Sequence, residues 1–283
     1  MTTARRHIWL CADDYGISRS VNAAIRDLIL RGRLNATSVM TAAPHFDAEE
    51  AEALDELNSG TTRAALGLHV TLTGPFKPLS DGFKPLGHGH FLPLNKMMRA
   101  AMMRRFNVQR LTIEVAMQVE AFVMAFGRPP DFIDGHQHVH LFPQVRDAVL
   151  KVAAEAAPDA WLRQCGRLRA AGRRNSRKEL VLDVLSIGFR RKARRLGVAV
   201  NPAFAGAYDF HDESDFAKVF PRFLAGLPNG GLVMCHPGFV DAELKRLDPL
   251  TDQREREFAY FNSDEFPRML GENGFALATP RSA

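Results

Sequence analysis

Cysteine is scarce in this chain of 283 residues: Cys11, Cys165 and Cys235 stand far apart. Without a CxxC pair or zinc-finger spacing, the sequence predicts neither a disulfide framework nor a thiolate metal site. No run of about 18 apolar residues is present, which argues against a membrane-spanning helix. The N-terminus also lacks a long apolar leader with a small-residue cleavage site, so we expect a soluble, cytoplasmic protein with reduced cysteines.

Internal repeats, low-complexity segments and linkers long enough to divide domains are absent as well. The length fits one α/β barrel of roughly 200 to 250 residues with insertions. We therefore predict a single domain over residues 1–283, with a loop insertion at about 74–94. That stretch holds four prolines and four glycines. It is too long for a plain connector, and long loops in compact domains are often lids or binding loops.

Apolar segments that alternate with helical patterns run through the whole chain. Strands are expected at 7–11, 36–42, 64–72, 131–134, 160–163, 197–200, 231–235 and 275–278, and helices between them include 143–157, 215–225 and 251–271. The first helix is expected to begin at a Ser18 or Ser20 cap and to end at Gly32. Such alternation favours parallel strands with right-handed crossovers, and so many units favour a closed or nearly closed barrel.

Three of the ten histidines lie within five residues, in the segment 134–140. In an extended chain, alternate side chains share a face, so His136, His138 and His140 are expected to point the same way. Imidazole suits borderline metals and proton transfer. The alternative is a set of structural histidines bonded to backbone carbonyls, and three in alternation favour a site.

Asp13 and Asp14 follow the first strand. Adjacent buried carboxylates raise one another's pKa unless a cation lies between them. Because extended neighbours face opposite sides, one aspartate can bind a metal while the other acts as base for water. The alternative is a helix cap and a turn residue before Gly16.

Two further histidines end predicted strands. His69 lies in an apolar strand, where a histidine is more often core than ligand. His236 precedes Pro237 and Gly238, which restrict its backbone and suit a general acid or base; the alternative is a strand-to-loop junction. Carboxyl ends of barrel strands form the active face, so these segments together predict one site.

Four motifs, in order along the chain, resemble those of the YdjC-like carbohydrate deacetylases (ChbG/HpnK type). They are Ala12-Asp13-Asp14-Tyr15-Gly16, Gly67-Leu68-His69-Val70-Thr71-Leu72-Thr73, Asp134-Gly135-His136-Gln137-His138-Val139-His140-Leu141-Phe142-Pro143 and Cys235-His236-Pro237-Gly238-Phe239-Val240-Asp241. The resemblance extends to the helix at 252–257. It implies an α/β fold, a distorted (β/α) barrel of the glycoside hydrolase/deacetylase type. It also implies hydrolysis of an N-acetyl group from an amino sugar, with one divalent metal.

The resemblance also implies roles for individual residues. Asp14, His69 and His136 would bind the metal, Asp13 would be the base and His236 the acid. His138 and His140 would line the substrate pocket or support the ligands. Tyr15, where the family commonly has Phe, would add a hydroxyl near the base, and Arg163 would contact the substrate. Cys11 replaces the family's usual Asn or Thr.

The family suggests magnesium, although two imidazoles suit zinc, manganese or iron better, so the metal stays open. It also makes a homodimer plausible. Rival functions are another metal-dependent barrel hydrolase, such as a phosphoesterase or a lactam-opening enzyme, and an inactive barrel that binds sugar or lipid.

A basic segment spans residues 163–195, with twelve Lys or Arg against Glu179 and Asp183. Leu180, Val184 and Phe189 are among the apolar residues expected on one helix face. This segment indicates either docking to anionic lipid or a barrel helix with a solvated basic face. No recognition motif or aromatic platform accompanies the charge, so we do not expect nucleic-acid binding.

Overall fold

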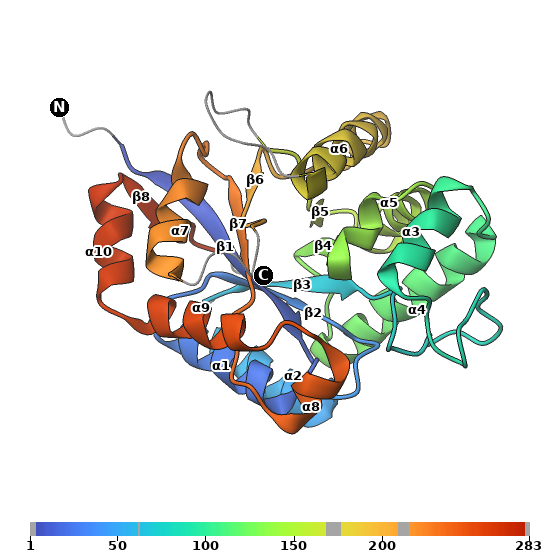
Figure 1. Cartoon of the computed structure of the whole chain (residues 1–283), viewed down its shortest axis with the longest axis horizontal. Helices are drawn as coiled ribbons and strands as arrows, with labels where there is room; N and C mark the ends of the chain where they lie inside the picture. Colours follow the sequence, from blue (N-terminus) through green and yellow to red (C-terminus); the bar gives the residue numbers. More distant parts are fainter. Residues whose placement is uncertain (1–3, 62, 168–176, 209–214, 281–283) are drawn as a thin grey trace.

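The computed structural model describes residues 4–61, 63–167, 177–208 and 215–280 (Figure 1). The described strands form one eight-stranded, wholly parallel sheet in the order β5-β4-β3-β2-β1-β7-β6, with β8 paired to β1. The strands are β1 (Arg6–Tyr15), β2 (Ala36–Val39), β3 (Ala65–Val70), β4 (Phe132–Gly135), β5 (Trp161–Leu162), β6 (Phe204–Ala205), β7 (Leu232–Cys235) and β8 (Phe275–Leu277).

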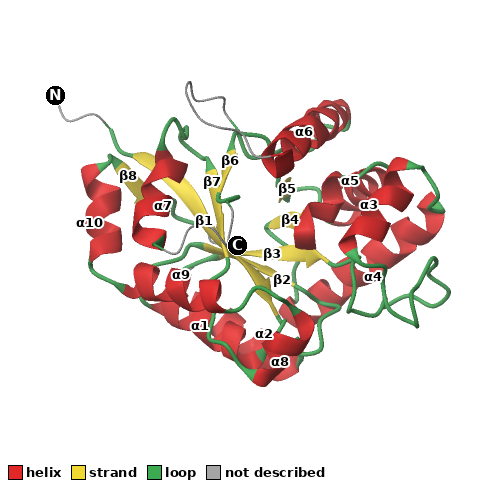
Figure 2. Ribbon diagram, viewed as in Figure 1, coloured by secondary structure: helices red, strands yellow, loops and turns green. Residues whose placement is uncertain are grey.

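Helices surround the strands (Figure 2), with α3, α4 and α5 on one side of the view and α7, α9 and α10 on the other. They are α1 (Arg19–Leu30), α2 (Ala48–Asp55), α3 (Leu94–Met102), α4 (Val108–Phe126), α5 (Val145–Ala156), α6 (Arg177–Arg195), α7 (Phe216–Leu224), α8 (Ala242–Leu247), α9 (Asp252–Asn262) and α10 (Glu265–Glu272), with 3-10 turns η1 (Glu56–Asn58) and η2 (His136–Leu141). Among the described residues, no helix combines the length and the apolar character needed to cross a bilayer.

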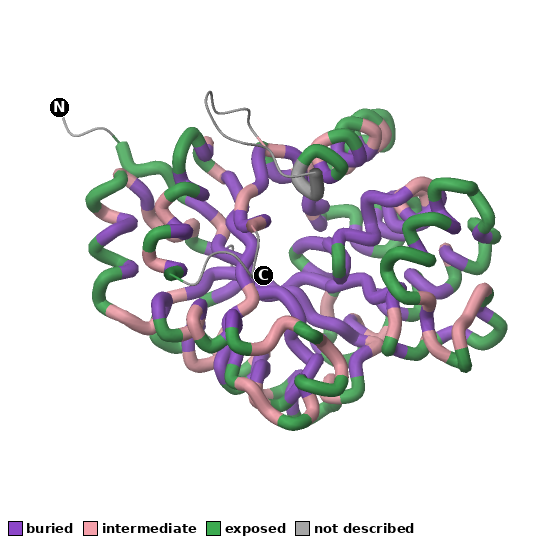
Figure 3. Tube along the Cα trace, viewed as in Figure 1, coloured by how far each residue is buried: buried purple, intermediate pink, exposed green. Residues whose placement is uncertain are grey.

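The sheet curls, as expected for a distorted barrel. A parallel bridge joins Leu162 at the end of β5 to Val200, and the Asn201 side chain bonds the backbone of Gln164. The segment just before β6 therefore lies against β5, the opposite edge of the sheet. The tube through β2, β3 and β4 is buried throughout (Figure 3), so the polar side chains on these strands, His69 and Asp134 among them, are buried as well.

The first β-α unit forms as the sequence predicts. Ser18 is the cap of α1: its hydroxyl accepts a hydrogen bond from Val21 N at 3.3 Å. Gly32 follows the helix with a φ of +66°, a conformation that glycine adopts without steric cost. α1 then packs Val21, Ile25 and other apolar residues into the core.

Two expected elements are wrong. Residues 197–200 contribute only the Val200 bridge, and the strand β6 comes later, at Phe204–Ala205. The expected helix over 251–271 is two helices, because the chain is extended at Ser263. The Ser263 hydroxyl donates to Tyr260 O at 2.7 Å and so occupies a carbonyl of the last turn of α9.

The loop over residues 74–94 is anchored against the protein. Phe76, Phe83 and Phe91 are buried. The Glu114 carboxylate accepts bonds from Ser80 N and the Ser80 hydroxyl at 2.8 and 2.6 Å. The Phe76 ring packs edge-on against His136, with centroids 5.7 Å apart, so the loop reaches the predicted site.

Candidate metal centre

Strand register brings the polar residues to one end of the sheet. His69 on β3 pairs with Asp134 on β4. Cys235 on β7 pairs with Ala12 on β1, so the residues that follow, His236 and Asp13, come from neighbouring strands. Because all strands are parallel, their carboxyl ends meet at one edge, as the sequence predicts.

An irregularity in β1 directs the two aspartates differently. The pairing of β1 with β2 shifts register between Ala12 and Tyr15, and Asp14 has a φ of 71°. This left-handed conformation is uncommon for a residue other than glycine, and such backbone strain often marks functional sites. The Asp14 carboxylate turns to two histidines, and the Asp13 carboxylate turns to an arginine.

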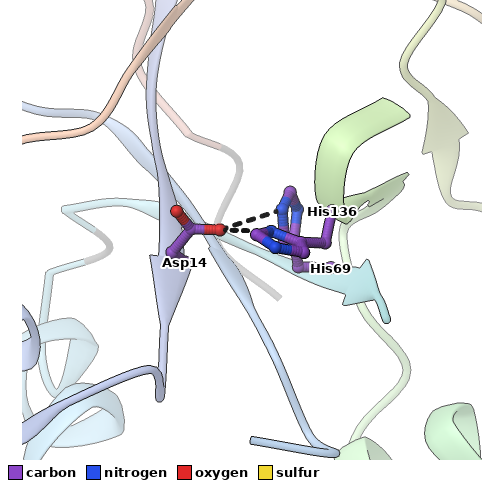
Figure 4. Close-up of side chains that lie close together, drawn as sticks. All are labelled: Asp14, His69 and His136. Atoms are coloured by element: carbon purple, nitrogen blue, oxygen red, sulfur yellow. Dashed lines mark hydrogen bonds and ion pairs between the residues drawn. The ribbon is translucent and has the colours of Figure 1, made fainter. Parts of the chain in front are cut away.

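Asp14, His69 and His136 converge from β1, β3 and the start of η2 (Figure 4). Asp14 Oδ1 lies 2.9 Å from His136 Nδ1 and 3.3 Å from His69 Nε2. All three side chains are buried, and the three potential ligand atoms lie within 4.8 Å of one another. One carboxylate oxygen and two imidazole nitrogens form a donor set that suits a divalent hydrolytic metal and leaves positions for water and substrate.

Asp134 orients His69. Its Oδ1 lies 2.6 Å from His69 Nδ1, and an ionised carboxylate only accepts, so Nδ1 donates and Nε2 faces Asp14. The Ser38 hydroxyl lies 3.0 Å from the same Nδ1. Burial by itself lowers the pKa of His69, but the Asp134 and Asp13 carboxylates outweigh it and raise that pKa to about 10. The carboxylates around His69 thus stabilise positive charge on its ring.

Arg163 holds the Asp13 carboxylate. Its Nη1 and Nη2 donate to Asp13 Oδ2 and Oδ1 at 2.7 and 2.6 Å, and Nη2 also pairs with Asp134. Burial raises the pKa of Asp13, but Arg163 and His69 outweigh it and hold that pKa below its usual range. Arg163 is fully buried, and its guanidinium lies against the Asp13 and Asp134 carboxylates.

The Arg163 guanidinium also fills a second acidic cluster. Cys11, Asp13 and Asp134 form a group that has metal-binding spacing. Arg163 Nη2 bonds the Cys11 sulfur at 3.1 Å as well as both carboxylates. The positive charge in this cluster is therefore supplied by the protein itself.

Arg254 on α9 holds the other oxygen of Asp14. Its Nη2 donates to Asp14 Oδ2 at 2.6 Å and to Asp248 Oδ2 at 3.1 Å. Burial raises the pKa of Asp14, but His136 and Arg254 outweigh it and hold that pKa well below its usual range. The bond to Arg254 leaves Oδ1 turned toward the two histidines.

His236 follows β7 and is half-buried. Its backbone N donates to Glu257 Oε2 at 2.5 Å, and Glu257 Oε1 accepts from the Tyr208 hydroxyl at 2.7 Å. Burial lowers the pKa of His236 to about 4, despite the nearby Asp14 and Asp13 carboxylates. Burial also raises the pKa of Glu257 to about 7. The imidazole is therefore neutral near pH 7 in this state.

The histidine segment is not extended, and its three histidines do not share a face. Gln137 and His138 have φ values of 53° and 60°, and the chain turns through η2 directly after β4. His138 Nδ1 lies 3.5 Å from the Cys165 sulfur. A Cβ on Gly135 would lie 2.9 Å from His140 Nδ1, so this tight turn depends on glycine.

His140 is a structural histidine, the alternative left open by the sequence. Its Nε2 lies 2.8 Å from Arg163 O, and its ring packs edge-on against Phe189 of α6. Burial lowers the pKa of His140 to about 4, so the ring is neutral and Nε2 donates to the carbonyl. It supports the segment that carries Arg163 and lies outside the group of metal donors.

Tyr15 lies apart from the acid pair. It is fully buried, and its hydroxyl lies 2.7 Å from Glu50 O and from Arg26 Nη1. Burial raises its pKa well above the usual value. The shift in β1 register turns this side chain toward α1 and α2, so the expected hydroxyl near the base is absent.

Sequence analysis did not identify three residues that contact the site, namely Asp134, Arg254 and Glu257. Asp134 stands at a strand end two residues before His136, a signal of the same kind that marked Asp13. Arg254 and Glu257 lie three residues apart, so they share a helix face, and both are fully buried. In the sequence, both fall at helical spacing with the apolar Tyr260 and Phe261, and charges within such an apolar stripe are the signal that would have identified them.

Comparison with known proteins gives one family. The family model described as YdjC-like protein matches residues 7–272. A carbohydrate deacetylase of Clostridium beijerinckii is 24% identical over 274 residues, covering 94% of this chain and 95% of the relative. A chitooligosaccharide deacetylase of Serratia marcescens is 28% identical over 276 residues, covering 95% of each chain.

The fold has a solved counterpart. A crystal structure from Enterococcus faecalis, named as a candidate cellobiose-phosphate cleavage protein, matches with a TM-score of 0.75. The two chains are 21% identical, and the match covers 98% of each. At this identity the similarity establishes the fold, an α/β barrel built on a curled parallel sheet.

Proposed function

This chain belongs to the YdjC-like protein family, and we propose that it is a metal-dependent hydrolase that removes the acetyl group from an N-acetylated amino sugar. The observation that carries the proposal is the buried group of Asp14, His69 and His136, next to a second carboxylate held by an arginine. Relatives of similar length are named carbohydrate and chitooligosaccharide deacetylases, which supports an acetylated sugar as substrate.

The roles of the chain's own groups follow from their charge states. When bound by Asp14, His69 and His136, a divalent metal supplies Lewis acidity toward a carbonyl oxygen and water. Asp13 is ionised and positioned by Arg163, so it is the base that takes a proton from the attacking water. Water attacks the acetyl carbonyl carbon, the carbon–nitrogen bond breaks, and acetate and the free amine leave.

His236 is proposed as the group that protonates the departing amine. Its ring is neutral near pH 7 in the free protein, so it has to receive a proton before it can protonate the amine. That proton comes from the attacking water, through Asp13, or from solvent. Glu257 fixes the backbone from which the ring projects. His138, on the turn after the ligand His136, is proposed to line the pocket.

The metal is proposed to be a single divalent ion. The family suggests magnesium, whereas two imidazole donors favour zinc or manganese. The acidic cluster beside the site already contains the Arg163 guanidinium, which disfavours a two-metal phosphoesterase. Elemental analysis of the purified protein identifies the ion, and a homodimer stays a prediction for sedimentation analysis.

Acetate release with and without chelator tests the function. The substrates are N-acetylglucosamine, chito-oligosaccharides and an N-acetylated glycolipid. We expect Asp13→Asn to abolish release while the metal stays bound, and His69→Ala or His136→Ala to lose the metal. His88→Ala, which removes an exposed loop histidine, is the matched control. Normal turnover by Asp13→Asn would refute the role of the base, and no acetate from any substrate would refute the deacetylase.

A further inference from the structure

Helix α6 carries apolar side chains on its outer side. Leu180, Val181, Val184 and Ile187 are all exposed, and 68% of Val184 is accessible to solvent. Single exposed apolar residues are common, but a contiguous group indicates an interaction surface. Residues 168–176, which precede the helix within the basic segment, lie outside the described residues.

The opposite side of α6 is fixed to the body of the protein. Leu182, Leu185 and Phe189 are buried there. The Ser186 hydroxyl accepts a bond from Cys165 N at 3.0 Å, and Phe189 packs on His140. The outer side is therefore held in a fixed direction at the rim of the molecule (Figure 3).

The apolar group continues into a cationic one. Positions 180, 184, 187, 191 and 194 recur at intervals of three and four, so they share one helix face. Arg190, Arg191, Arg194 and Arg195 are exposed at the end of this face. Among the described residues they have no acidic partner within salt-bridge distance. The acid Asp183 is paired with Arg167 at 2.9 Å.

We propose that the α6 outer face docks on an anionic lipid bilayer, where the α6 outer face is defined as Leu180, Val181, Val184, Ile187, Arg190, Arg191, Arg194 and Arg195. Apolar side chains enter the boundary between headgroups and acyl chains, and the arginines bind lipid phosphates. Docking would place the protein at a membrane surface. This proposal does not depend on the proposed function, because its evidence is the α6 outer face and not the metal centre.

The charges on the α6 outer face distinguish an anionic bilayer from two other possible partners, a second copy of the chain and nucleic acid. If two copies paired through α6 in antiparallel fashion, the arginines of each would lie on the apolar half of the other. If they paired in parallel, arginine would face arginine, and both arrangements bury cations without partners. No aromatic side chain on this face offers a platform for bases, which disfavours nucleic acid. An anionic bilayer offers acyl chains to the apolar side chains and phosphates to the arginines of the same face.

Vesicle co-sedimentation of the whole protein tests the proposal. Vesicles of phosphatidylcholine alone are compared with vesicles that also contain phosphatidylglycerol. We expect binding to the anionic vesicles only, weakened by added salt because the arginine contacts are exposed to solvent. Equal sedimentation with both vesicles, or none with either, would overturn the proposal.

Paired variants locate the contact. Arg191→Gln with Arg194→Gln should lower the partition coefficient about fivefold for each arginine, or about 25-fold together. Val184→Ser with Ile187→Ser should lower it at least about tenfold. Two substitutions on other helices are matched controls: Met124→Ser on α4 and Arg268→Gln on α10. Met124 is 81% exposed. Equal effects of control and α6 variants would overturn the assignment.

Two parallel measurements separate the remaining outcomes. Urea unfolding confirms that the variants are folded, since all the substitutions lie at exposed positions. The wild type could fail to bind vesicles while Val184→Ser with Ile187→Ser converts a dimer to a monomer. In that case the α6 outer face binds a second copy of the chain, and the lipid proposal fails. Acetate release from a soluble chito-oligosaccharide reports only on the proposed function, so its failure with normal vesicle binding leaves the docking surface standing.

Discussion

Replacement of Arg163 by methionine removes a fully buried guanidinium that is bonded to two carboxylates, those of Asp13 and Asp134. Methionine fills much of the volume of the aliphatic stem but carries no charge. Asp134 keeps its bond to His69, whereas Asp13 loses both of its hydrogen bonds to the guanidinium and its nearest counter-charge. Removal of one partner of a buried ion pair costs about 3–5 kcal/mol, and we expect a loss of that size.

Urea unfolding of the metal-free protein measures this loss. Asp13→Asn in the Arg163→Met background removes the orphaned charge, so the double variant should recover at least about half of the lost free energy of unfolding. Arg31→Met breaks an exposed ion pair with Asp27 and serves as the control, with an expected loss below about 1 kcal/mol. A double variant as unstable as Arg163→Met alone would refute the reasoning, because the cost would then come from packing.

The same substitution has a kinetic consequence. Burial raises the pKa of Asp13, and the Arg163 charge is the first of the effects that oppose it. Without that charge, the pKa of Asp13 should rise, so the acidic limb of the pH–rate profile should move to higher pH. An unchanged acidic limb in a folded, metal-loaded Arg163→Met variant would count against Asp13 as the base that Arg163 positions.

Arg254, Glu257 and Gly135 support the site without belonging to the group of metal donors. Arg254→Lys cannot reach both Asp14 and Asp248, so metal affinity should fall about 10–100-fold in a competition titration, and an unchanged affinity would contradict the positioning role. Burial raises the pKa of Glu257 in the folded protein from 4.5 to about 7. Glu257 therefore contributes about 3 kcal/mol to the free energy of unfolding below pH 4.5, and this contribution is lost as pH rises through 7. Glu257→Gln should abolish that part of the pH dependence of urea unfolding. Gly135→Ala places a Cβ against His140 and should cost about 1–3 kcal/mol and loosen metal binding, whereas wild-type stability and affinity would show that the turn has room.

Local sequence was sufficient wherever the relevant interaction is local. The Ser18 cap and the end of α1 at Gly32 depend on neighbours three or four residues away, and both were predicted correctly. The same holds for most strand positions, because short, mostly apolar segments bounded by helical patterns are typical of buried strands. The break at Ser263 was missed although Pro267 stands within the expected helix 251–271, and proline is typical of the first turn of a new helix.

The site residues likewise fall into those that the sequence could indicate and those that it could not. The sequence indicated that polar residues gather at the carboxyl ends of strands, because parallel strands bring such ends together. The choice of Asp14, His69 and His136 among them came from the resemblance to the YdjC-like family, and the structure brings these three side chains together. The grouping of His136 with His138 and His140 assumed an extended chain. A turn with two residues at positive φ sends the three side chains in different directions, and the sequence pattern alone did not reveal it.

Only the tertiary structure decided which charges pair. Arg163 meets Asp13 across 150 residues, and Arg254 meets Asp14 across 240. These contacts depend on strand order and on how helices pack against the sheet, which no local pattern encodes. The sequence by itself predicted the barrel and the polar residues at its strand ends. Burial and sheet order determined that one aspartate faces two histidines while its neighbour is held by an arginine, because a buried charge is stable only beside a partner.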